Sequence, residues 1–277
     1  MMSNAQRKLT RVVDARPSSD GDGVKIYRVA GSDMHTRMDP FLMLDEICSE
    51  DGADYIGGFP SHPHRGFETI TYMLEGAMRH QDHMGNEGVV SAGDVQWMTA
   101  ARGVIHSEMP EQQDGLLHGF QLWLNLPAAE KMQAARYRDY RSSEFPLVSL
   151  PEGGSAKVLA GELEGGKSPV AVGTTSPTLL DIRLAAGECY QYRVNQAYNL
   201  MLYVYRGASS ELLHRQMGFY TGGDRVTIQA GSEGVGMLLL AAQPLHEPIK
   251  QYGPFVMNTA EEIEQAISDY NRGVLVS

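Results

Sequence analysis

The sequence predicts an all-β protein: two antiparallel β-sandwich or barrel domains in tandem, with a short C-terminal helix. Three observations favour this fold class. Short runs rich in β-branched and aromatic residues recur along both halves of the chain. The 30 glycines and 13 prolines lie scattered among these runs and indicate many turns. Turn motifs of the first half also return in the second half at a nearly constant spacing, which is typical of an internal repeat.

The N-terminal half carries the clearest strand pattern. A long candidate strand runs from Phe67 to Leu74, and Glu75-Gly76 ends it with a turn. Residues 17–23 are rich in turn formers and separate the first two strands. The other strand candidates of this half are residues 9–14, 24–30, 78–82, 89–97, 104–109 and 116–126, and residues 41–45 are a short apolar run that is expected to be buried.

Residues 128–150 interrupt this pattern. The stretch from Ala128 to Arg141 is charged and alanine-rich, and we interpret it as a short helix or an extended connector. The expected boundaries are therefore a first domain at 1–127, a linker at 128–150 and a second domain at 151–277. The second domain has strand candidates at 156–160, 178–184, 190–194, 200–205, 224–229 and 235–241, and then a helix that starts with the capping-box pair Thr259 and Glu262.

Composition excludes several classes of protein. The formal net charge of −11 opposes binding to nucleic acid phosphates, so we expect no direct nucleic acid partner. No apolar run has the length of a signal peptide or a membrane span. The two cysteines, Cys48 and Cys189, are far apart and do not form a disulfide framework. These features together predict a cytoplasmic protein.

Two short polar stretches predict a metal site. His62 and His64 are two residues apart, and so are His106 and Glu108. On a β-strand, side chains two residues apart share one face. If the two strands lie side by side, three imidazoles and one carboxylate converge on one point. This donor set suits a first-row transition ion, because it contains no thiolate and too few oxygen atoms for calcium.

The internal repeat predicts that only the first domain holds this site. Residues 72–76 match residues 203–207, and Gly103-Val104 matches Gly234-Val235, in each case at an offset of 131. Gly93-Asp94 matches Gly223-Asp224 at an offset of 130. An offset of 131 places Arg193, Asn195, Met237 and Leu239 at the positions of the four donors. The second copy has thus lost its metal-binding side chains.

The other histidines and most aromatic residues are interpreted as structural. His80, His83 and His118 lack partners at ligand spacing, although His80 or His118 could line a cavity. His35, His214 and His246 are taken as ordinary surface or hydrogen-bonded residues. The methionines are expected to fill the core. Phe67, Trp97, Phe120 and Trp123 are expected to pack inside the first domain.

These motifs resemble those of the pirin family, a bicupin branch of the cupin superfamily. The similarity lies in HPHRGFETITYMLEG at residues 62–76, GDVQWMTAARGVIHSE at 93–108 and PLHEPIKQYGPFVMNTAEEIEQAISDY at 244–270. It implies two cupin domains in tandem, with a metal only in the first.

The resemblance also implies the ligands and the metal. The ligands would be His62, His64, His106 and Glu108, and the ion would be iron(II). Manganese, nickel, copper and zinc remain alternatives on donor chemistry. The general cupin pattern would put a ligand at Glu68, whereas the pirin pattern gives that role to Glu108. Glu68 is therefore expected beside the ligands rather than on the metal.

Two functions follow from the resemblance. The first is a metal-dependent dioxygenase of the quercetin 2,3-dioxygenase type, which opens the flavonol heterocycle with O2. Glu108 would act there as the base that accepts the hydroxyl proton. The alternative is a redox-responsive regulatory protein that binds a transcription factor or a metabolic enzyme; an isomerase with the same kind of site is a third hypothesis. The expected partners are a small flavonol-like substrate, O2 and, in the regulatory case, a protein. We expect a monomer.

Overall fold

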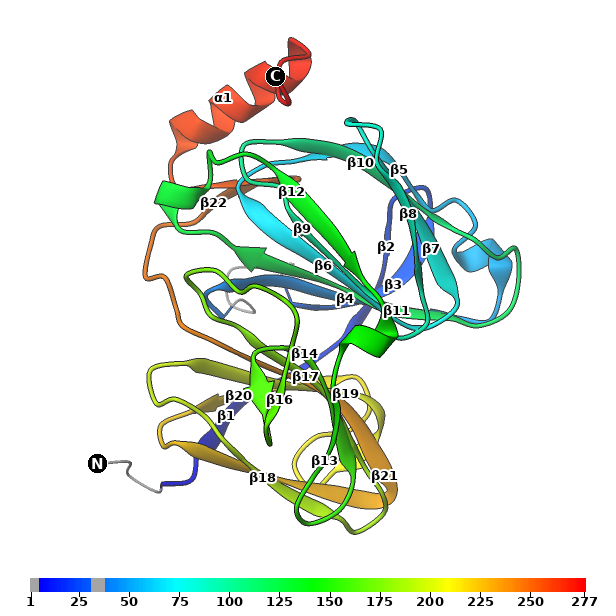
Figure 1. The fold of residues 1–277 in the computed structure, drawn as a ribbon, viewed down its shortest axis with the longest axis vertical. Coiled ribbons are helices and arrows are strands. Elements are labelled where there is room, and N and C mark those ends of the chain that lie inside the picture. The colour runs from blue at the N-terminus through cyan, green and yellow to red at the C-terminus, as the bar shows by residue number, and fades with distance from the viewer. Residues whose placement is uncertain (1–4, 31–37) are drawn as a thin grey trace. The chain divides into compact units, whose positions relative to one another are not determined.

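The computed structural model describes residues 5–30 and 38–277. Antiparallel strands dominate this part of the chain, joined by short 3₁₀ turns at Gly52–Asp54, Ala128–Glu130 and Ser142–Glu144 (Figure 1). The all-β prediction is confirmed, with open sheets in place of closed barrels. No helix among these residues is both long and apolar enough to cross a membrane.

The strands form two compact units. One contains residues 16–142 and 245–277 and is called the histidine unit, because it holds His62, His64 and His106. The other contains residues 5–15 and 143–244 and is called the companion unit. Each unit has its own sheets and its own apolar core.

The histidine unit is a sandwich of two sheets. As far as the structure describes it, the larger sheet has the order β12-β9-β6-β11-β4-β3-β2 and the smaller one β5-β10-β7-β8. The larger sheet consists of β2 (Arg16–Asp20), β3 (Val24–Ala30), β4 (Phe41–Ser49), β6 (Phe67–Glu75), β9 (Val95–Thr99), β11 (Leu117–Asn125) and β12 (Arg136–Tyr140). The smaller sheet consists of β5 (Phe59–His64), β7 (Ala77–Asp82), β8 (Glu87–Ser91) and β10 (Val104–Pro110).

Strand β6 illustrates how the sequence assigns the two faces of the larger sheet. Phe67 and Thr71 point toward the smaller sheet, where the Phe67 ring lies 5.1 Å from the ring of His64. Tyr72 points the other way and stacks on Phe120, with 6.3 Å between ring centroids. This alternation follows from the two-residue period of a strand. Odd-numbered positions of β6 therefore face the interior of the sandwich.

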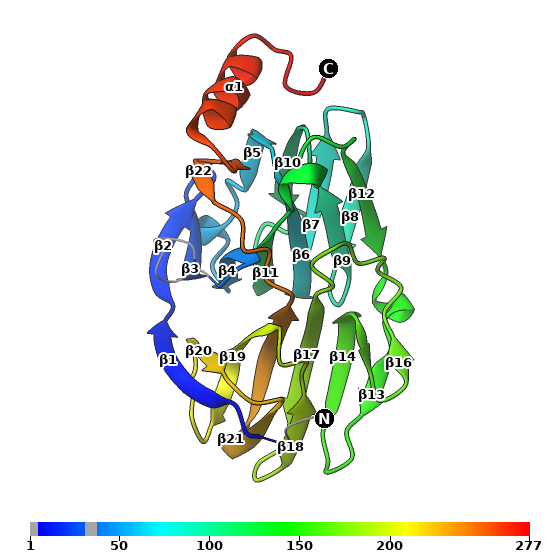
Figure 2. The ribbon, with the colours of Figure 1, turned by 90° about the vertical axis from the view of Figure 1, so that its left-hand side faces the viewer.

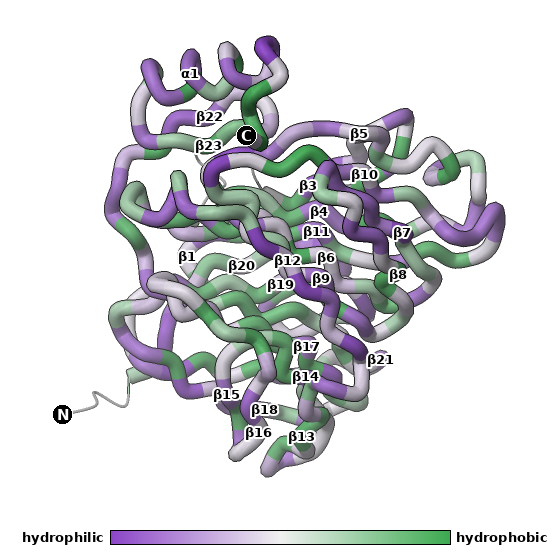
Figure 3. Tube along the Cα trace, turned by 45° about the horizontal axis from the view of Figure 1, so that its top comes forward, coloured by the Kyte–Doolittle hydropathy of each residue, from purple (hydrophilic) through white to green (hydrophobic). Residues whose placement is uncertain are grey.

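The companion unit repeats the same sheet. Its strand order within the described residues is β1-β20-β19-β21-β17-β14-β13, and β18 pairs with the first half of β21. Hydrophobic residues follow β17, β19 and β21 and form its core (Figure 3). Its strands are β1 (Lys8–Asp14), β13 (Leu147–Ser149), β14 (Ser155–Ala160), β15 (Glu162–Leu163), β16 (Gly166–Lys167), β17 (Thr178–Leu184), β18 (Cys189–Arg193), β19 (Asn199–Ser209), β20 (Gln216–Thr221) and β21 (Arg225–Ala242).

The order of the strands shows that the internal repeat does not keep the constant offset that the turn motifs predicted. β6 and β19 occupy the same central place, so the first turn match holds. However, the half of β21 that contains Met237 and Leu239 pairs with β17 and β19, which is the place of β11. Residues Arg225–Gln229 occupy the position equivalent to β10, and Val226 and Ile228 among them pair with β18. The mapping of His106 and Glu108 was therefore wrong, because residues 210–215 alone connect β19 to β20, where the histidine unit has β7 and β8 between β6 and β9.

The two compact units assign both ends of the chain differently from the expected domains at residues 1–127 and 151–277. Strand β1 pairs with β20 of the companion unit, whereas residues 245–277 belong to the histidine unit (Figure 2). Those residues form β22 (Lys250–Tyr252), β23 (Phe255–Met257) and α1 (Ala260–Asn271). The connector is extended rather than helical, since β12 within it joins the larger sheet beside β9.

Apolar packing and the buried side chains of Arg65 and Lys131 hold residues 245–277 in place. Phe255, Met257 and Ile263 form a buried cluster, with the capping box of α1 intact. The guanidinium of Arg65 lies 2.8 Å from the carboxylate of Asp269. Gly66, with a φ of 94°, lets the backbone approach so closely that a Cβ there would lie 1.9 Å from a carbonyl oxygen of β23. The end of β5, the strand that carries His62 and His64, is thus fixed against residues 245–277.

Replacing Lys131 by methionine is expected to destabilise the histidine unit by about 3 kcal/mol. The Lys131 ammonium is buried and donates to the carbonyl oxygens of Gly66 and Val256 and to Asn125 Oδ1, at 2.6, 3.0 and 2.6 Å. Burial lowers the pKa of Lys131 to about 8. Methionine would fill the space but leave these acceptors without a donor.

Urea unfolding followed by tryptophan fluorescence measures this effect, because Trp97 and Trp123 are the tryptophans of the chain and both lie in the histidine unit. Lys167→Met, at an exposed position of the companion unit, is the control and should leave the urea midpoint unchanged. An equal midpoint for both variants would show that Lys131 does not anchor the segment.

Candidate metal centre

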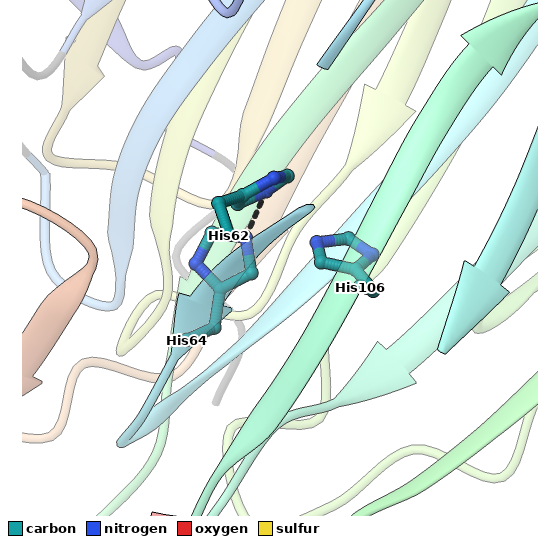
Figure 4. A group of neighbouring side chains, drawn as sticks. All are labelled: His62, His64 and His106. Atoms are coloured by element: carbon teal, nitrogen blue, oxygen red, sulfur yellow. Dashed lines mark hydrogen bonds between the residues drawn. The ribbon is translucent and has the colours of Figure 1, made fainter. Parts of the chain in front are cut away.

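Strands β5 and β10 present three histidines to the interior of the sandwich. The strands are antiparallel neighbours, with His62 directly opposite His106. His62 and His64 lie two residues apart on β5, and all three rings point toward one another (Figure 4). Ring centroids are separated by 4.4 Å between His62 and His106 and by 4.9 Å between His64 and His106. The structure thus brings together the imidazoles that the spacing predicted.

The arrangement of ring nitrogens fits a transition metal ion. One nitrogen from each ring lies within 4.8 Å of the other two. His62 Nε2 and His64 Nε2 are 3.0 Å apart. Two nitrogens bound at about 2.1 Å and at a right angle to each other would be separated by about 3.0 Å. His106 Nε2 is buried without a hydrogen-bond partner among the described residues, as expected for an atom that binds a metal.

Burial keeps two of these imidazoles neutral. It lowers the pKa of His64 well below the usual value, and the neighbouring His62 adds to this effect. Burial likewise lowers the pKa of His106, with contributions from His64, His62 and His80. Neutral imidazole is the form that binds metal ions, since its lone pair is free. The lowered pKa values of His64 and His106 therefore favour metal binding by these two imidazoles near neutral pH.

Glu108 is buried next to the histidines but is held by other residues. Its Oε1 accepts a hydrogen bond from Thr71 Oγ1 at 2.9 Å, and its Oε2 accepts one from Gln121 Nε2 at 2.7 Å. Among the described residues, the group of donors close enough to share one ion comprises the three imidazoles and does not include this carboxylate. Glu108, the expected fourth ligand, is therefore buried near the histidines, with both oxygens engaged by neutral donors.

His80 is a member of the site that sequence reasoning missed. It lies opposite Glu108 on β7, and its Nδ1 is 3.3 Å from Nδ1 of His106. This contact leaves Nε2 of His106 free to bind an ion, and it fixes the orientation of the ring. No sequence signal marks His80, because β7 and β10 are separated along the chain by β8 and β9, and spacing in the sequence does not encode their register.

Glu68 does not lie beside the histidines, contrary to the expectation. Its carboxylate accepts a hydrogen bond from Thr99 Oγ1 at 2.6 Å, on the opposite face of β6 from Thr71. The reason is the strand period, since residue 68 has the opposite parity to residues 67 and 71. Burial raises the pKa of Glu68.

A cavity of about 650 Å³ opens onto His62 and His64, and its size suits a small organic ligand. Met43, Phe59 and Trp123 supply an apolar wall, and Gln121 joins the cavity to Glu108. The complete lining is Asp20, Gly21, Asp22, Arg28, Met43, Phe59, Pro60, His62, His64, Gln121, Trp123, Gln251, Gly253 and Pro254. Neither His80 nor His118 belongs to this lining.

The remaining histidines have other places. His118 forms a 2.8 Å contact with Glu46 on the outer face of the larger sheet. His83 accepts a hydrogen bond from the backbone N–H of Ile105. His214 and His246 are both exposed. His35 lies outside the described residues.

The chain is similar over nearly its whole length to proteins of one family. A Pseudomonas aeruginosa protein named "Putative quercetin 2,3-dioxygenase" is 47% identical, with 97% of this chain and 98% of that protein covered. Human pirin is 39% identical, with 96% of this chain and 93% of that protein covered. The crystal structure of a quercetin 2,3-dioxygenase from Acinetobacter baumannii superposes with a TM-score of 0.91 at 33% identity and covers 99% of both chains.

Two family models match complementary parts of the sequence. The model described as Pirin matches residues 23–124, and the one described as the Pirin C-terminal cupin domain matches residues 179–276. These matches agree with the paired sheets of the two units and confirm the tandem cupin fold. This chain belongs to the pirin family.

Proposed function

We propose that this protein is a metal-dependent dioxygenase of the quercetin 2,3-dioxygenase type, which opens the heterocycle of a flavonol with O2. The observation that carries the proposal is the convergence of three imidazoles, two of which, those of His62 and His64, line a cavity of about 650 Å³. The names of the relatives in Pseudomonas aeruginosa and Acinetobacter baumannii supply the reaction class. We also propose that the protein is cytoplasmic and that its oligomeric state is a monomer.

His62, His64 and His106 would hold the ion, with Glu108 as the fourth donor. For Glu108 to do so, one of its oxygens must move closer to the three imidazoles, and it could keep its hydrogen bond from Thr71 or Gln121 through a second lone pair. Three imidazoles and a carboxylate suit iron(II), while manganese, nickel, copper and zinc remain chemical alternatives. When bound, the ion supplies a Lewis acid that binds the flavonol oxygens and a centre for the reaction with O2.

Glu108 is the group that would accept the hydroxyl proton of the flavonol. Its carboxylate is buried and accepts its hydrogen bonds from an uncharged hydroxyl and an uncharged amide. Gln121 lines the cavity and donates to Glu108 Oε2, so it connects this carboxylate with the space in which the substrate would bind. Phe59 and Trp123 would pack against the flat rings and exclude water from them.

Replacing Gln121 by leucine is expected to lower kcat by about 10-fold, with a smaller change in KM. The leucine retains most of the volume but cannot donate to Glu108 Oε2, so the carboxylate loses its orientation. Steady-state turnover of quercetin by the iron-loaded protein measures the effect. Gln251→Leu is the matched control, because Gln251 also lines the cavity but donates to the backbone of Gly253. Equal kcat values for the two variants would contradict a role for Gln121 in holding Glu108.

Oxygen uptake together with loss of quercetin absorbance tests the function itself. The protein is loaded with iron(II) without oxygen, desalted and then mixed with aerated quercetin. Multiple turnovers with matched consumption of O2 and flavonol are expected. Tight binding of quercetin without any oxygen uptake would contradict the dioxygenase and favour the regulatory alternative.

A further inference from the structure

A second group of metal-binding side chains lies on the outer face of the larger sheet of the histidine unit. Glu46 and Cys48 are two residues apart on β4, and His118 on β11 lies directly opposite Cys48. One donor atom from each of these residues lies within 4.8 Å of the other two. This group brings a carboxylate oxygen, a thiol sulfur and an imidazole nitrogen together.

This group is separate from the three imidazoles of the first centre. Met43, Gln121 and Trp123 line the cavity and occupy odd-numbered positions of β4 and β11. Glu46, Cys48 and His118 occupy even-numbered positions of the same strands, and these point to the opposite face. The backbone of the sheet therefore stands between the two groups.

Two of the three side chains already touch each other, and two of the three are accessible to solvent. The carboxylate of Glu46 is fully buried, and its Oε1 lies 2.8 Å from His118 Nε2. Cys48 and His118 are half-buried, so an ion could reach them from solvent. Pairing of β4 with β11 fixes the backbone on both sides, which reduces the ordering cost of binding.

We propose that Glu46, Cys48 and His118 bind a second divalent ion of the borderline-soft class, with zinc as the preferred occupant. Sulfur, nitrogen and oxygen donors in one group are typical of zinc sites. A thiolate discriminates against magnesium and calcium, and such donors bind zinc more tightly than iron(II). The first centre offers nitrogen and oxygen atoms alone. The two sites should therefore select different metals from a mixture.

Cobalt(II) is the probe that tests this proposal, because its thiolate complexes show a charge-transfer absorption in the near ultraviolet. The first centre contains no cysteine and cannot produce this band. The full-length protein, reduced and free of metal, is titrated with cobalt(II), and zinc(II) is then added. The expected result is a charge-transfer band that saturates with cobalt and disappears as zinc displaces it.

Variants of the two cysteines identify the ligand. Cys48→Ser should lose the band completely, whereas Cys189→Ser and His106→Ala should keep it, because neither residue belongs to the second group. His118→Gln should weaken cobalt binding by at least about 10-fold. Circular dichroism of each metal-free variant shows that the fold is retained, and Cys48→Ala provides a second substitution if serine disturbs β4.

The opposite results would overturn the proposal. A wild-type protein without the charge-transfer band would mean that the group is only an ion pair between Glu46 and His118. A band that persists in Cys48→Ser would place the sulfur ligand elsewhere in the chain.

Discussion

Replacing His106 by alanine is expected to reduce flavonol turnover by at least about 100-fold and to abolish iron retention. His106 is buried, and its Nε2 has no partner among the residues that the structure describes. Residues that merely support a metal ligand change affinity by about 10–100-fold, so loss of one of three imidazoles should exceed that range. Iron content after anaerobic loading and desalting, together with kcat, measures both effects.

The fold should survive this substitution at a cost of about 0.5–3 kcal/mol. Thermal unfolding and circular dichroism measure that cost. His62→Ala provides a second test, because His62 is only half-buried and its removal disturbs the packing less. His214→Ala, at an exposed position of the companion unit, is the control and should keep full activity. Normal iron content in both the His62 and His106 variants would refute the proposed centre.

Replacing Glu108 by glutamine is expected to lower kcat by about 100-fold while the protein keeps part of its iron. The glutamine has the same shape as the glutamate. The Thr71 hydroxyl can still donate to its oxygen, and the Gln121 amide can turn to accept from its NH2 group. The structure of the site should therefore persist, and the lost property is the ability to accept a proton.

Quercetin turnover and iron content of the same preparation separate these two effects. Glu68→Gln is the matched control, since Glu68 is an equally buried carboxylate on the other face of β6. Its kcat should stay within about twofold of wild type, in keeping with the small effects of substitutions away from a site. A Glu108→Gln protein that works at the wild-type rate would exclude Glu108 as the base.

The sequence predicted the elements whose signal is local. The alternation in β6 and the HxH spacing depend only on the two-residue period of a strand, and both appear in the structure as expected. The capping box at Thr259 is equally local, and α1 begins where it predicts. Strand β2, in contrast, was taken as a turn because Pro17 and Ser18 have low strand propensity. Pairing with β3 outweighs that propensity.

Features that depend on pairing between distant strands could not be predicted. His80 meets His106 only because β7 pairs with β10, and Gln121 reaches Glu108 from a different sheet. The sandwich brings these side chains together, and no spacing along the chain encodes the contact. The docking of residues 245–277 depends in the same way on Arg65 and Lys131, whose partners lie more than a hundred residues away.

A second ion at Cys48 would affect any measurement of metal content. Total metal per chain would then combine two sites, and zinc from the medium could conceal an empty first centre. Experiments on the three imidazoles therefore need a readout that is specific for position as well as for the element.

Anomalous diffraction from crystals loaded with iron(II), measured on both sides of the iron absorption edge, supplies that readout. The expected result is one strong iron peak within about 2.0–2.3 Å of ring nitrogens of His62, His64 and His106, with no iron in the companion unit. A fully loaded crystal that shows no iron peak among these three rings, or shows it bound elsewhere, would contradict the proposed metal centre and the chemistry that depends on it.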